Sequence, residues 1–256
     1  MEFLRNGQVY PYLKFLRKKY FPSPEQREET DRLPQMEIFY SKFLSKGELC
    51  FDVGANLGNR TEVFLKLGAT VVAVEPQPLR AKMLQLQFGK RIQVIKSALG
   101  ESEKQGLMYI SDSPEISSMS MDWINSVSNS RFKNRRWSKS ETVSITTLDK
   151  LISTYGVPKF CKIDVEGYEV QVLKGLSNPI PYLSFEYTVP EKFENIEQCF
   201  GLLSSLGKFE SNYTIGENTD FELSTWSSAS IVLNGISRIS KEGLFGDIYV
   251  HFLKDK

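Results

Sequence analysis

The sequence predicts an α/β protein with an open, mostly parallel sheet and helices on both faces. Two observations predict this fold. Apolar strand-like runs alternate with helical patterns along most of the chain, which is typical of crossover units. The clearest junction, CFDVGANLGNRT at residues 50–61, has the pattern of a buried strand, a glycine turn and a helix. The chain has 256 residues, of which 41% are hydrophobic, so it can bury one large core.

The first 45 residues are expected to be an N-terminal helical extension, and residues 46–256 one domain. Apolar residues fall on one helical face at 12–20, opposite a basic cluster, and again at 36–44, with a linker at 22–34 between them. Packing of the first helix on its own domain or on a partner subunit is favoured over docking at a membrane surface. The second helix should end near Gly47 and cover the sheet.

The remaining elements follow in alternation. Strands are expected at 49–53, 71–75, 92–98, 160–165, 183–187 and 247–252, and helices end at 67, begin at 78, span 148–155, end at 176 and span 194–206. Residues 100–143 are rich in Ser, Asn and Arg and break this alternation. They are predicted to be an insertion at one end of the sheet.

Charge and cysteine content limit the partners. Lys and Arg number 32 against 31 acidic residues, so no global field recruits nucleic acid or a membrane. No window approaches the roughly 20 apolar residues that span a bilayer, so no stable membrane insertion is expected. The odd, widely spaced Cys50, Cys161 and Cys199 fit neither a disulfide framework nor a zinc site. They are expected to be buried thiols in a cytoplasmic protein.

The glycine turn predicts a nucleotide site, because free backbone N–H groups point outward where a strand turns into a helix. It lacks the Gly-Lys-Ser/Thr ending of a phosphate-binding loop, and Asn56 replaces the second glycine of a dinucleotide fingerprint. Asp52 would repel a pyrophosphate but suits a ligand with a cationic amino acid, such as S-adenosylmethionine. Glu75, at the end of the next strand, can accept both ribose hydroxyls. Alternatively, Asp52 caps the helix and Glu75 merely ends its strand.

Several motifs resemble one family. FDVGANLGNRT, VVAVEPQP, SALG, the region of Ser118, TTLDKL and above all CKIDVEGYEVQVLKGL are similar to FkbM-type methyltransferases, S-adenosylmethionine-dependent enzymes that mostly methylate hydroxyl groups. The resemblance covers about residues 48–187 and, more weakly, FGDIYVHFLK at the C-terminus. It implies a Rossmann-like class I methyltransferase fold, with a seven-stranded sheet whose last strand is antiparallel.

The resemblance also implies a cofactor site at the ends of the first three strands. The residues assigned to S-adenosylmethionine are Asp52, Gly54, Ala55, Asn56, Gly58, Thr61, Glu75, Pro76, Ser97 and Ala98. Many methyltransferases carry an acid after the third strand to bind the adenine amine. This chain has Ser97-Ala98-Leu99 there, which supplies no such acid.

Three carboxylates are predicted at the acceptor side. Asp164 and Glu166 lie two apart in an extended run and Glu186 ends the neighbouring strand, so all three should meet at one rim as catalytic residues. A carboxylate base suffices for a hydroxyl, because the sulfonium is already activated. Alternatively, Glu166 caps the next helix, and Lys162 or a nearby lysine neutralises the rest. A metal-free mechanism is favoured over a divalent ion on this rim.

Further substrate-binding candidates lie in the insertion, namely Ser118, Arg131, Arg135 and Arg136. The basic run could grip an anionic acceptor or be a solvated loop. The predicted function is S-adenosylmethionine-dependent O-methyl transfer to a small-molecule or glycan hydroxyl, on a sugar or secondary metabolite. The alternatives are an N-methyltransferase and a non-catalytic nucleotide-binding scaffold. Assembly into a homo-oligomer is left open.

Overall fold

The main sheet has seven strands in the order β3-β2-β1-β7-β8-β10-β9. The strands are β1 (Leu49–Val53), β2 (Thr70–Val74), β3 (Ile92–Ile95), β7 (Phe160–Ile163), β8 (Tyr182–Thr188), β9 (Phe209–Tyr213) and β10 (Phe245–Phe252). From β3 to β8 all neighbours are parallel, whereas β10 runs antiparallel to β8 and β9. The predicted mostly parallel sheet with an antiparallel last strand is therefore confirmed.

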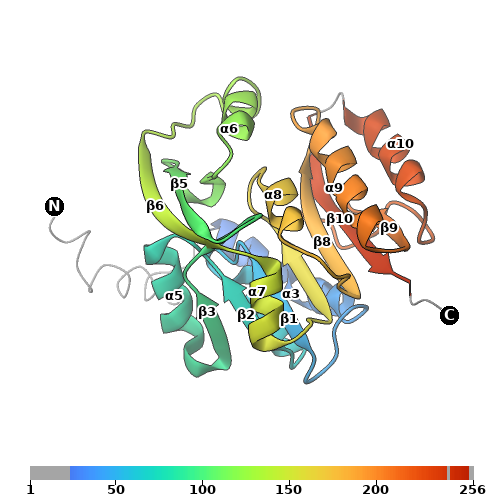
Figure 1. Ribbon diagram of the computed structural model, residues 1–256, viewed down its shortest axis with the longest axis horizontal. Helices are drawn as coiled ribbons and strands as arrows, with labels where there is room; N and C mark the ends of the chain where they lie inside the picture. The colour runs from blue at the N-terminus through green and yellow to red at the C-terminus, as the bar shows by residue number, and fades with distance from the viewer. Residues whose placement is uncertain (1–23, 241–242, 254–256) are drawn as a thin grey trace, which may run out of the picture.

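The computed structural model describes residues 24–240 and 243–253, so the predicted helix at 12–20 lies outside the described residues. Helices cover both faces of the sheet (Figure 1). One face carries α3 (Pro24–Tyr40), α4 (Asn59–Lys66) and α5 (Pro78–Phe88), and the other carries α7 (Leu148–Tyr155), α8 (Glu169–Lys174), α9 (Phe193–Leu206) and α10 (Ala229–Ile239). No helix in the described part is long and apolar enough to span a bilayer.

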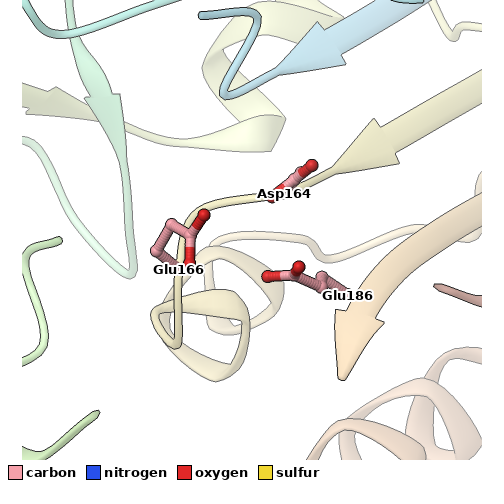
Figure 2. Close-up of side chains that lie close together, drawn as sticks. All are labelled: Asp164, Glu166 and Glu186. Atoms are coloured by element: carbon pink, nitrogen blue, oxygen red, sulfur yellow. The ribbon is translucent and has the colours of Figure 1, made fainter. Parts of the chain in front are cut away.

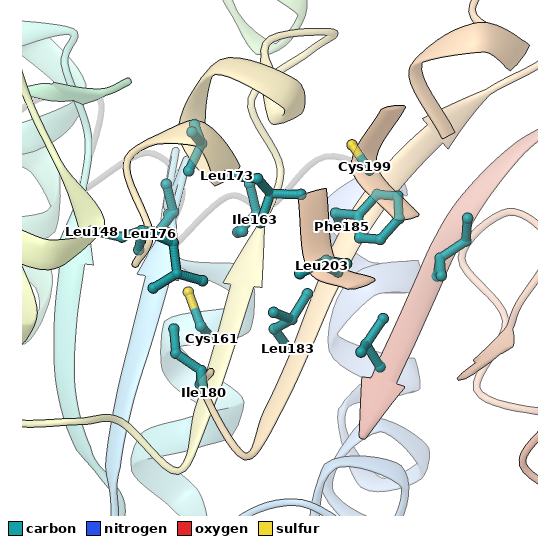
Figure 3. Close-up of a cluster of buried hydrophobic side chains, with 14 of the residues drawn as sticks. Leu148, Cys161, Ile163, Leu173, Leu176, Ile180, Leu183, Phe185, Cys199 and Leu203 are labelled. Atoms are coloured by element: carbon teal, nitrogen blue, oxygen red, sulfur yellow. The ribbon is translucent and has the colours of Figure 1, made fainter. Parts of the chain in front are cut away.

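The larger core lies between the sheet and the α7–α10 layer. Alternate residues of each strand point to opposite faces, so Phe51 joins this core while its neighbour Cys50 joins the other. Figure 3 shows Cys161 and Leu183 of the central strands facing Leu203 of α9. All three cysteines are buried and unpaired, as predicted.

Aromatic packing fixes α3 on the opposite face. The Phe39 ring of α3 packs edge-on against that of Tyr249, and the Tyr40 ring against that of Phe64, with centroids 5.2 and 5.1 Å apart. The prediction of a linker at 22–34 was wrong, because the helix already begins at Pro24. Its first turns are mostly polar and show no apolar period, and the packing of Met36 and Phe39 further along stabilises it.

Residues 98–146 build a second, three-stranded sheet in the order β4-β6-β5. Its strands are β4 (Ala98–Leu99), β5 (Lys104–Ile110) and β6 (Lys139–Thr146). The short helix η2 (Pro114–Ile116) and the helix α6 (Met121–Ser128) lie between β5 and β6, and another short helix, η1 (Gly89–Arg91), precedes β3 of the main sheet. Trp123 of α6 packs on the loop after β7, where a Cβ on Gly167 would lie 2.3 Å from the Trp123 Cγ. The segment predicted as an insertion thus packs against the carboxyl end of β7.

Candidate functional site

A cavity of about 830 Å³ opens at the carboxyl ends of β1, β2, β7 and β8. Its lining combines four segments that follow strands, at 52–57, 74–77, 97–99 and 164–166. Trp123 and Met119 contribute from the region of the smaller sheet. This is where an open α/β sheet binds ligands.

The glycine turn is pressed against the end of β7. Gly54 has a φ of +82°, and a Cβ there would lie 1.7 Å from the Asp164 carbonyl oxygen, so only glycine fits. Asn56 also adopts a left-handed backbone, with φ +52°. Its side-chain oxygen is buried and has no partner among the described residues, although Asn56 lines the cavity. This oxygen is an acceptor that a bound ligand could satisfy.

Glu75 closes the turn from β2. Its carboxylate accepts the backbone N–H groups of Asn56, at 2.9 Å, and Gln77, at 2.8 Å. Burial raises the pKa of Glu75 to about 7, against the opposing effect of these backbone donors. Each carboxylate oxygen retains a further lone pair, so the group can still accept hydroxyl donors from a ribose.

Asp52 is 2% exposed and accepts a hydrogen bond from the Thr61 hydroxyl. Burial raises the pKa of Asp52, although the bond from Thr61 lowers it. Asp52 thus fastens the start of α4 and still lines the cavity. Gly58 and Thr61 do not line it. A Cβ on Gly58 would meet the Phe88 ring at 2.4 Å, so this glycine serves the packing of the turn on α5.

The remaining residues predicted for the cofactor do line the cavity, namely Gly54, Ala55, Asn56, Glu75, Pro76, Ser97 and Ala98. Their arrangement follows the strand order, with Ser97 and Ala98 after β3, Glu75 after β2 and the turn after β1. An elongated ligand lying across the strand ends would contact these residues in the order of the strands, from β3 to β1.

Asp164, Glu166 and Glu186 form an acidic rim on the other side of the cavity (Figure 2). One carboxylate oxygen from each lies within 4.8 Å of the others. The parallel register pairs Ile163 with Phe185, which brings the next residues of the two strands together. The predicted meeting of these carboxylates is confirmed.

Two buried side chains hold the loop that contains Glu166, a residue with a φ of +55°. The Glu169 carboxylate accepts the backbone N–H groups of Val165 and Gly167, each at 3.2 Å. The Ser118 hydroxyl donates to the Glu166 carbonyl oxygen at 2.6 Å. Ser118, predicted to bind substrate, does not line the cavity and instead supports the rim.

Sequence reasoning missed Glu169. Its only signal was an acid in the first turn of a predicted helix. Burial raises the pKa of Glu169 to about 7.

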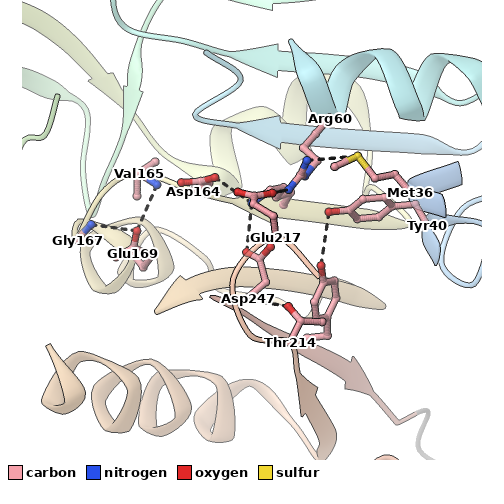
Figure 4. Close-up of polar contacts among 12 residues, drawn as sticks. Met36, Tyr40, Arg60, Asp164, Val165, Gly167, Glu169, Thr214, Glu217 and Asp247 are labelled. Carbon is pink, nitrogen blue, oxygen red and sulfur yellow. Dashed lines mark hydrogen bonds and ion pairs between the residues drawn. The ribbon is translucent and has the colours of Figure 1, made fainter. Parts of the chain in front are cut away.

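Lys162 distinguishes Asp164 from the other two acids. Its Nζ lies 3.0 Å from Asp164 Oδ2 and 3.2 Å from Asp247 Oδ1. Figure 4 shows these two carboxylates. Burial alone would lower the pKa of Lys162, but these two carboxylates raise it well above its usual value. Asp164 is therefore the rim acid with a fixed cationic partner. The alternative in which a lysine neutralises the acids applies to Asp164 but not to Glu166 or Glu186.

The Glu166 and Glu186 carboxylates make no hydrogen bond to another residue in the described ranges. Burial raises the pKa of both acids well above the usual range, and the neighbouring carboxylates raise it further. The raised pKa of these two acids distinguishes them from the ion-paired Asp164. Three carboxylates this close could also hold a divalent cation, since hard cations prefer oxygen ligands. The metal-free mechanism stays a prediction.

The arginines of the basic run do not meet at the cavity. Arg131 pairs with Glu191 at 3.1 Å and donates to the carbonyl oxygens of Val189 and Leu244, so its charge is used internally. Arg135 and Arg136 are exposed and do not line the cavity. The hypothesis that this run grips an anionic acceptor gains no support, because Arg131 lines the cavity but is paired internally and the other two arginines do not line it.

Residues 52–213 match the family model described as Methyltransferase FkbM domain. The chain belongs to the FkbM methyltransferase family. Its cofactor is S-adenosylmethionine, and its reaction is methyl transfer. The cavity fits this cofactor, because it offers a buried acid after β2, an unsatisfied acceptor on Asn56 and a volume usual for ligand sites.

Solved structures of methyltransferases are among those to which the chain is similar. The precorrin-6y C5,15-methyltransferase of Geobacter metallireducens is 8% identical, with a TM-score of 0.45 over 84% of this chain and 86% of that one. A putative O-methyltransferase from Klebsiella pneumoniae is 10% identical, with a TM-score of 0.44 over 94% and 96%. The plantazolicin methyltransferase BpumL, solved with S-adenosylhomocysteine, is 10% identical, with a TM-score of 0.42 over 95% and 97%. A comparison with curated proteins finds no match.

Proposed function

We propose that this FkbM methyltransferase transfers a methyl group from S-adenosylmethionine to a hydroxyl of a sugar or secondary metabolite. The acidic rim carries the proposal, because three carboxylates lie within 4.8 Å of one another beside the cavity. The Asp164 backbone contacts the glycine turn, so the rim directly adjoins the cofactor side. A proton acceptor placed there is what a hydroxyl needs when it becomes a nucleophile.

S-adenosylmethionine supplies a methyl group already activated on a sulfonium. Asp164 is the proposed general base, held by Lys162 at 3.0 Å. It takes the hydroxyl proton as the acceptor oxygen bonds to the methyl carbon, and the electrons of the broken C–S bond stay on sulfur. Glu166 and Glu186, whose pKa values are raised, are proposed to orient the hydroxyl through hydrogen bonds. Most of the rate comes from this positioning.

The lining of the acceptor side supports a ring-shaped acceptor. Phe132 lines the cavity beside the buried Trp123, and its partly exposed ring can pack on the face of a sugar or polyketide ring. The net charge of +1 gives no general attraction to nucleic acid. A small molecule or glycan is therefore the proposed substrate class.

Methyl transfer to an amino group is the alternative that the experiment must test. A cationic loop at the acceptor would disfavour a protonated amine, but Arg131 is paired, and Arg135 and Arg136 do not line the cavity. The rim acids could bind such an amine. Matched acceptors that differ only in a hydroxyl or an amine therefore decide between O- and N-methyl transfer.

The test uses S-adenosylmethionine with an isotopically labelled methyl group and a panel of glycans, polyketides and nucleotide-linked sugars. Each acceptor is offered with its amino analogue, and products are analysed by mass spectrometry and NMR. Labelled O-methyl products from the hydroxyl members support the proposal. Label found only on the amino analogues would replace O-methyl by N-methyl transfer, and no product from an enzyme that binds the cofactor would favour a scaffold.

A further inference from the structure

The part of the cavity next to α3 contains a positive charge that the proposed chemistry does not use. Among the described residues, the Lys and Arg side chains that line the cavity are Arg32, Arg60, Arg131 and Lys162. Two of them already have strong acceptors. Lys162 contacts two carboxylates, and Arg131 contacts the Glu191 carboxylate and several carbonyl oxygens.

Arg60, in the first turn of α4, is less completely satisfied. One terminal nitrogen donates to the Glu217 carboxylate, and the other donates to the Met36 sulfur at 3.5 Å (Figure 4). Its Nε is buried without a partner among the described residues. A thioether is only a weak acceptor, so a guanidinium with five donors has one strong acceptor here. The side chain keeps 17% exposure beside the cavity.

The position of Arg60 matches one end of the cofactor. Adenosine is assigned to the ends of β3 and β2, where Glu75 lies, and the reacting centre to the junction of Gly54 with Asp164. Arg60 interacts electrostatically with Lys162 of β7 and Asp247 of β10, two strands on the side of β1 away from β3. It contacts Met36 of α3 and Glu217 of the loop after β9 (Figure 4). The end of S-adenosylmethionine remote from adenine carries its single carboxylate.

We propose that Arg60 binds the carboxylate of the methionine moiety of S-adenosylmethionine. A planar guanidinium matches a carboxylate with two parallel hydrogen bonds, and Glu217 fixes the guanidinium from the other side. The carboxylate of the ligand takes donors that the ligand-free protein leaves with sulfur or without a partner. The assignment rests on the family's cofactor and does not depend on which acceptor is methylated.

Calorimetry with two ligands isolates this contact. S-adenosylmethionine and its decarboxylated form share the adenosine, the sulfonium and the amino group, and differ only in the carboxylate. Each is titrated into the wild type, Arg60→Met and Arg32→Met. Arg60→Met should lose about tenfold to hundredfold affinity for the full cofactor, the usual scale of charge-assisted hydrogen bonds, and little for the decarboxylated form. Arg32→Met is the matched control and should keep the wild-type ratio.

Three outcomes would overturn the proposal. Equal losses for both ligands would make Arg60 a purely structural residue, and a changed ratio in Arg32→Met alone would move the carboxylate to Arg32. A wild type that binds neither ligand would remove the cofactor assignment itself, which a failure confined to Arg60→Met does not. Arg60→Lys keeps the charge without the fork, and its affinity ratio should fall between those of the wild type and Arg60→Met, so a folded variant remains if Arg60→Met does not fold.

Discussion

The two sides of the cavity are built in different ways. The cofactor side, at the ends of β1 to β3, uses backbone groups and near neighbours, since Glu75 binds amides 19 and 2 residues away. The acceptor side depends on distant partners, such as Lys162 with Asp247, 85 residues apart, and Ser118 with the Glu166 loop, 48 residues apart. We propose that the first side binds the cofactor and that the second side contacts the acceptor. Variants on the two sides should therefore affect different constants.

The largest expected effect is on turnover in Asp164→Asn. The amide keeps the shape of the side chain but cannot take a proton, so turnover should fall by roughly a hundredfold or more, the usual scale for a lost general base. Steady-state kinetics with saturating cofactor measure this loss. Full activity in a folded Asp164→Asn protein would exclude Asp164 from the mechanism.

Replacing Glu75 should act on the other side. Glu75→Ala removes the acceptor assigned to the ribose hydroxyls and the partner of two backbone amides, so S-adenosylhomocysteine affinity should fall by about tenfold to hundredfold. Asp52→Ala should weaken binding less, since Asp52 mainly fastens Thr61. Calorimetry gives both constants, and wild-type affinity in Glu75→Ala would exclude it from the cofactor site.

The raised pKa of Glu75 predicts opposite pH slopes for binding and stability. The ionised form accepts ribose hydroxyls, so S-adenosylhomocysteine affinity should rise about tenfold from pH 6 to pH 8, across the pKa of about 7. Stability has the opposite slope, because the pKa of Glu75 in the folded protein lies above its ordinary 4.5. The contribution of Glu75 to the free energy of unfolding of the unliganded protein is therefore largest below pH 4.5 and is lost as the pH rises to about 7.

Two variants separate the causes of these slopes. Glu169 also has a pKa of about 7, so Glu169→Gln should reduce the slope of stability and leave the slope of binding. Glu75→Gln should flatten the slope of binding. A binding slope unchanged in Glu75→Gln would contradict the assignment.

Replacing the arginines of the insertion should affect stability at one position and have little effect on kinetics at the other two. Arg131→Ala breaks an ion pair with a Glu191 side chain that is 6% exposed, and should lower the free energy of unfolding by about 1 to 3 kcal/mol. Arg135→Ala with Arg136→Ala should change the acceptor Michaelis constant by less than about twofold, as is usual for exposed positions. A large rise in that constant would restore the anion-gripping hypothesis.

Chelation should have the smallest effect. The metal-free mechanism predicts unchanged turnover after treatment with a chelator and dialysis, because Asp164 has Lys162 as its cationic partner. Activity that is lost on chelation and restored by magnesium or manganese would instead place a divalent ion on the acidic rim.

The fold could be predicted wherever apolar patterns are local. The strands of the main sheet and the helices beside them follow, from β1 to α9, from period and glycine positions, whereas the smaller sheet and α6 at 98–146, β9 and α10 were not predicted. In β9 the buried residues include Ser211 and Asn212, and Asn212 is satisfied by bonds with the backbone of Leu223. A buried polar strand with distant partners has no pattern that a single sequence reveals.

The site divides in the same way. Asp52, Glu75 and the glycine turn are near in sequence, so their meeting at strand ends could be predicted. The roles of Ser118 and Arg131 could not, because their partners lie 48 to 113 residues away. Both residues have chemistry that suits a ligand, and only tertiary packing shows that the protein itself uses them.

The dissociation constant of S-adenosylhomocysteine in Glu75→Ala and in Asp164→Asn tests the division of the cavity most directly. Because Glu75 belongs to the cofactor side and Asp164 to the acceptor side, only Glu75→Ala should lose affinity, and Asp164→Asn should stay within about twofold of the wild type. Similar losses in both variants would contradict the separation of the two sides, and wild-type affinity in both would place the cofactor elsewhere.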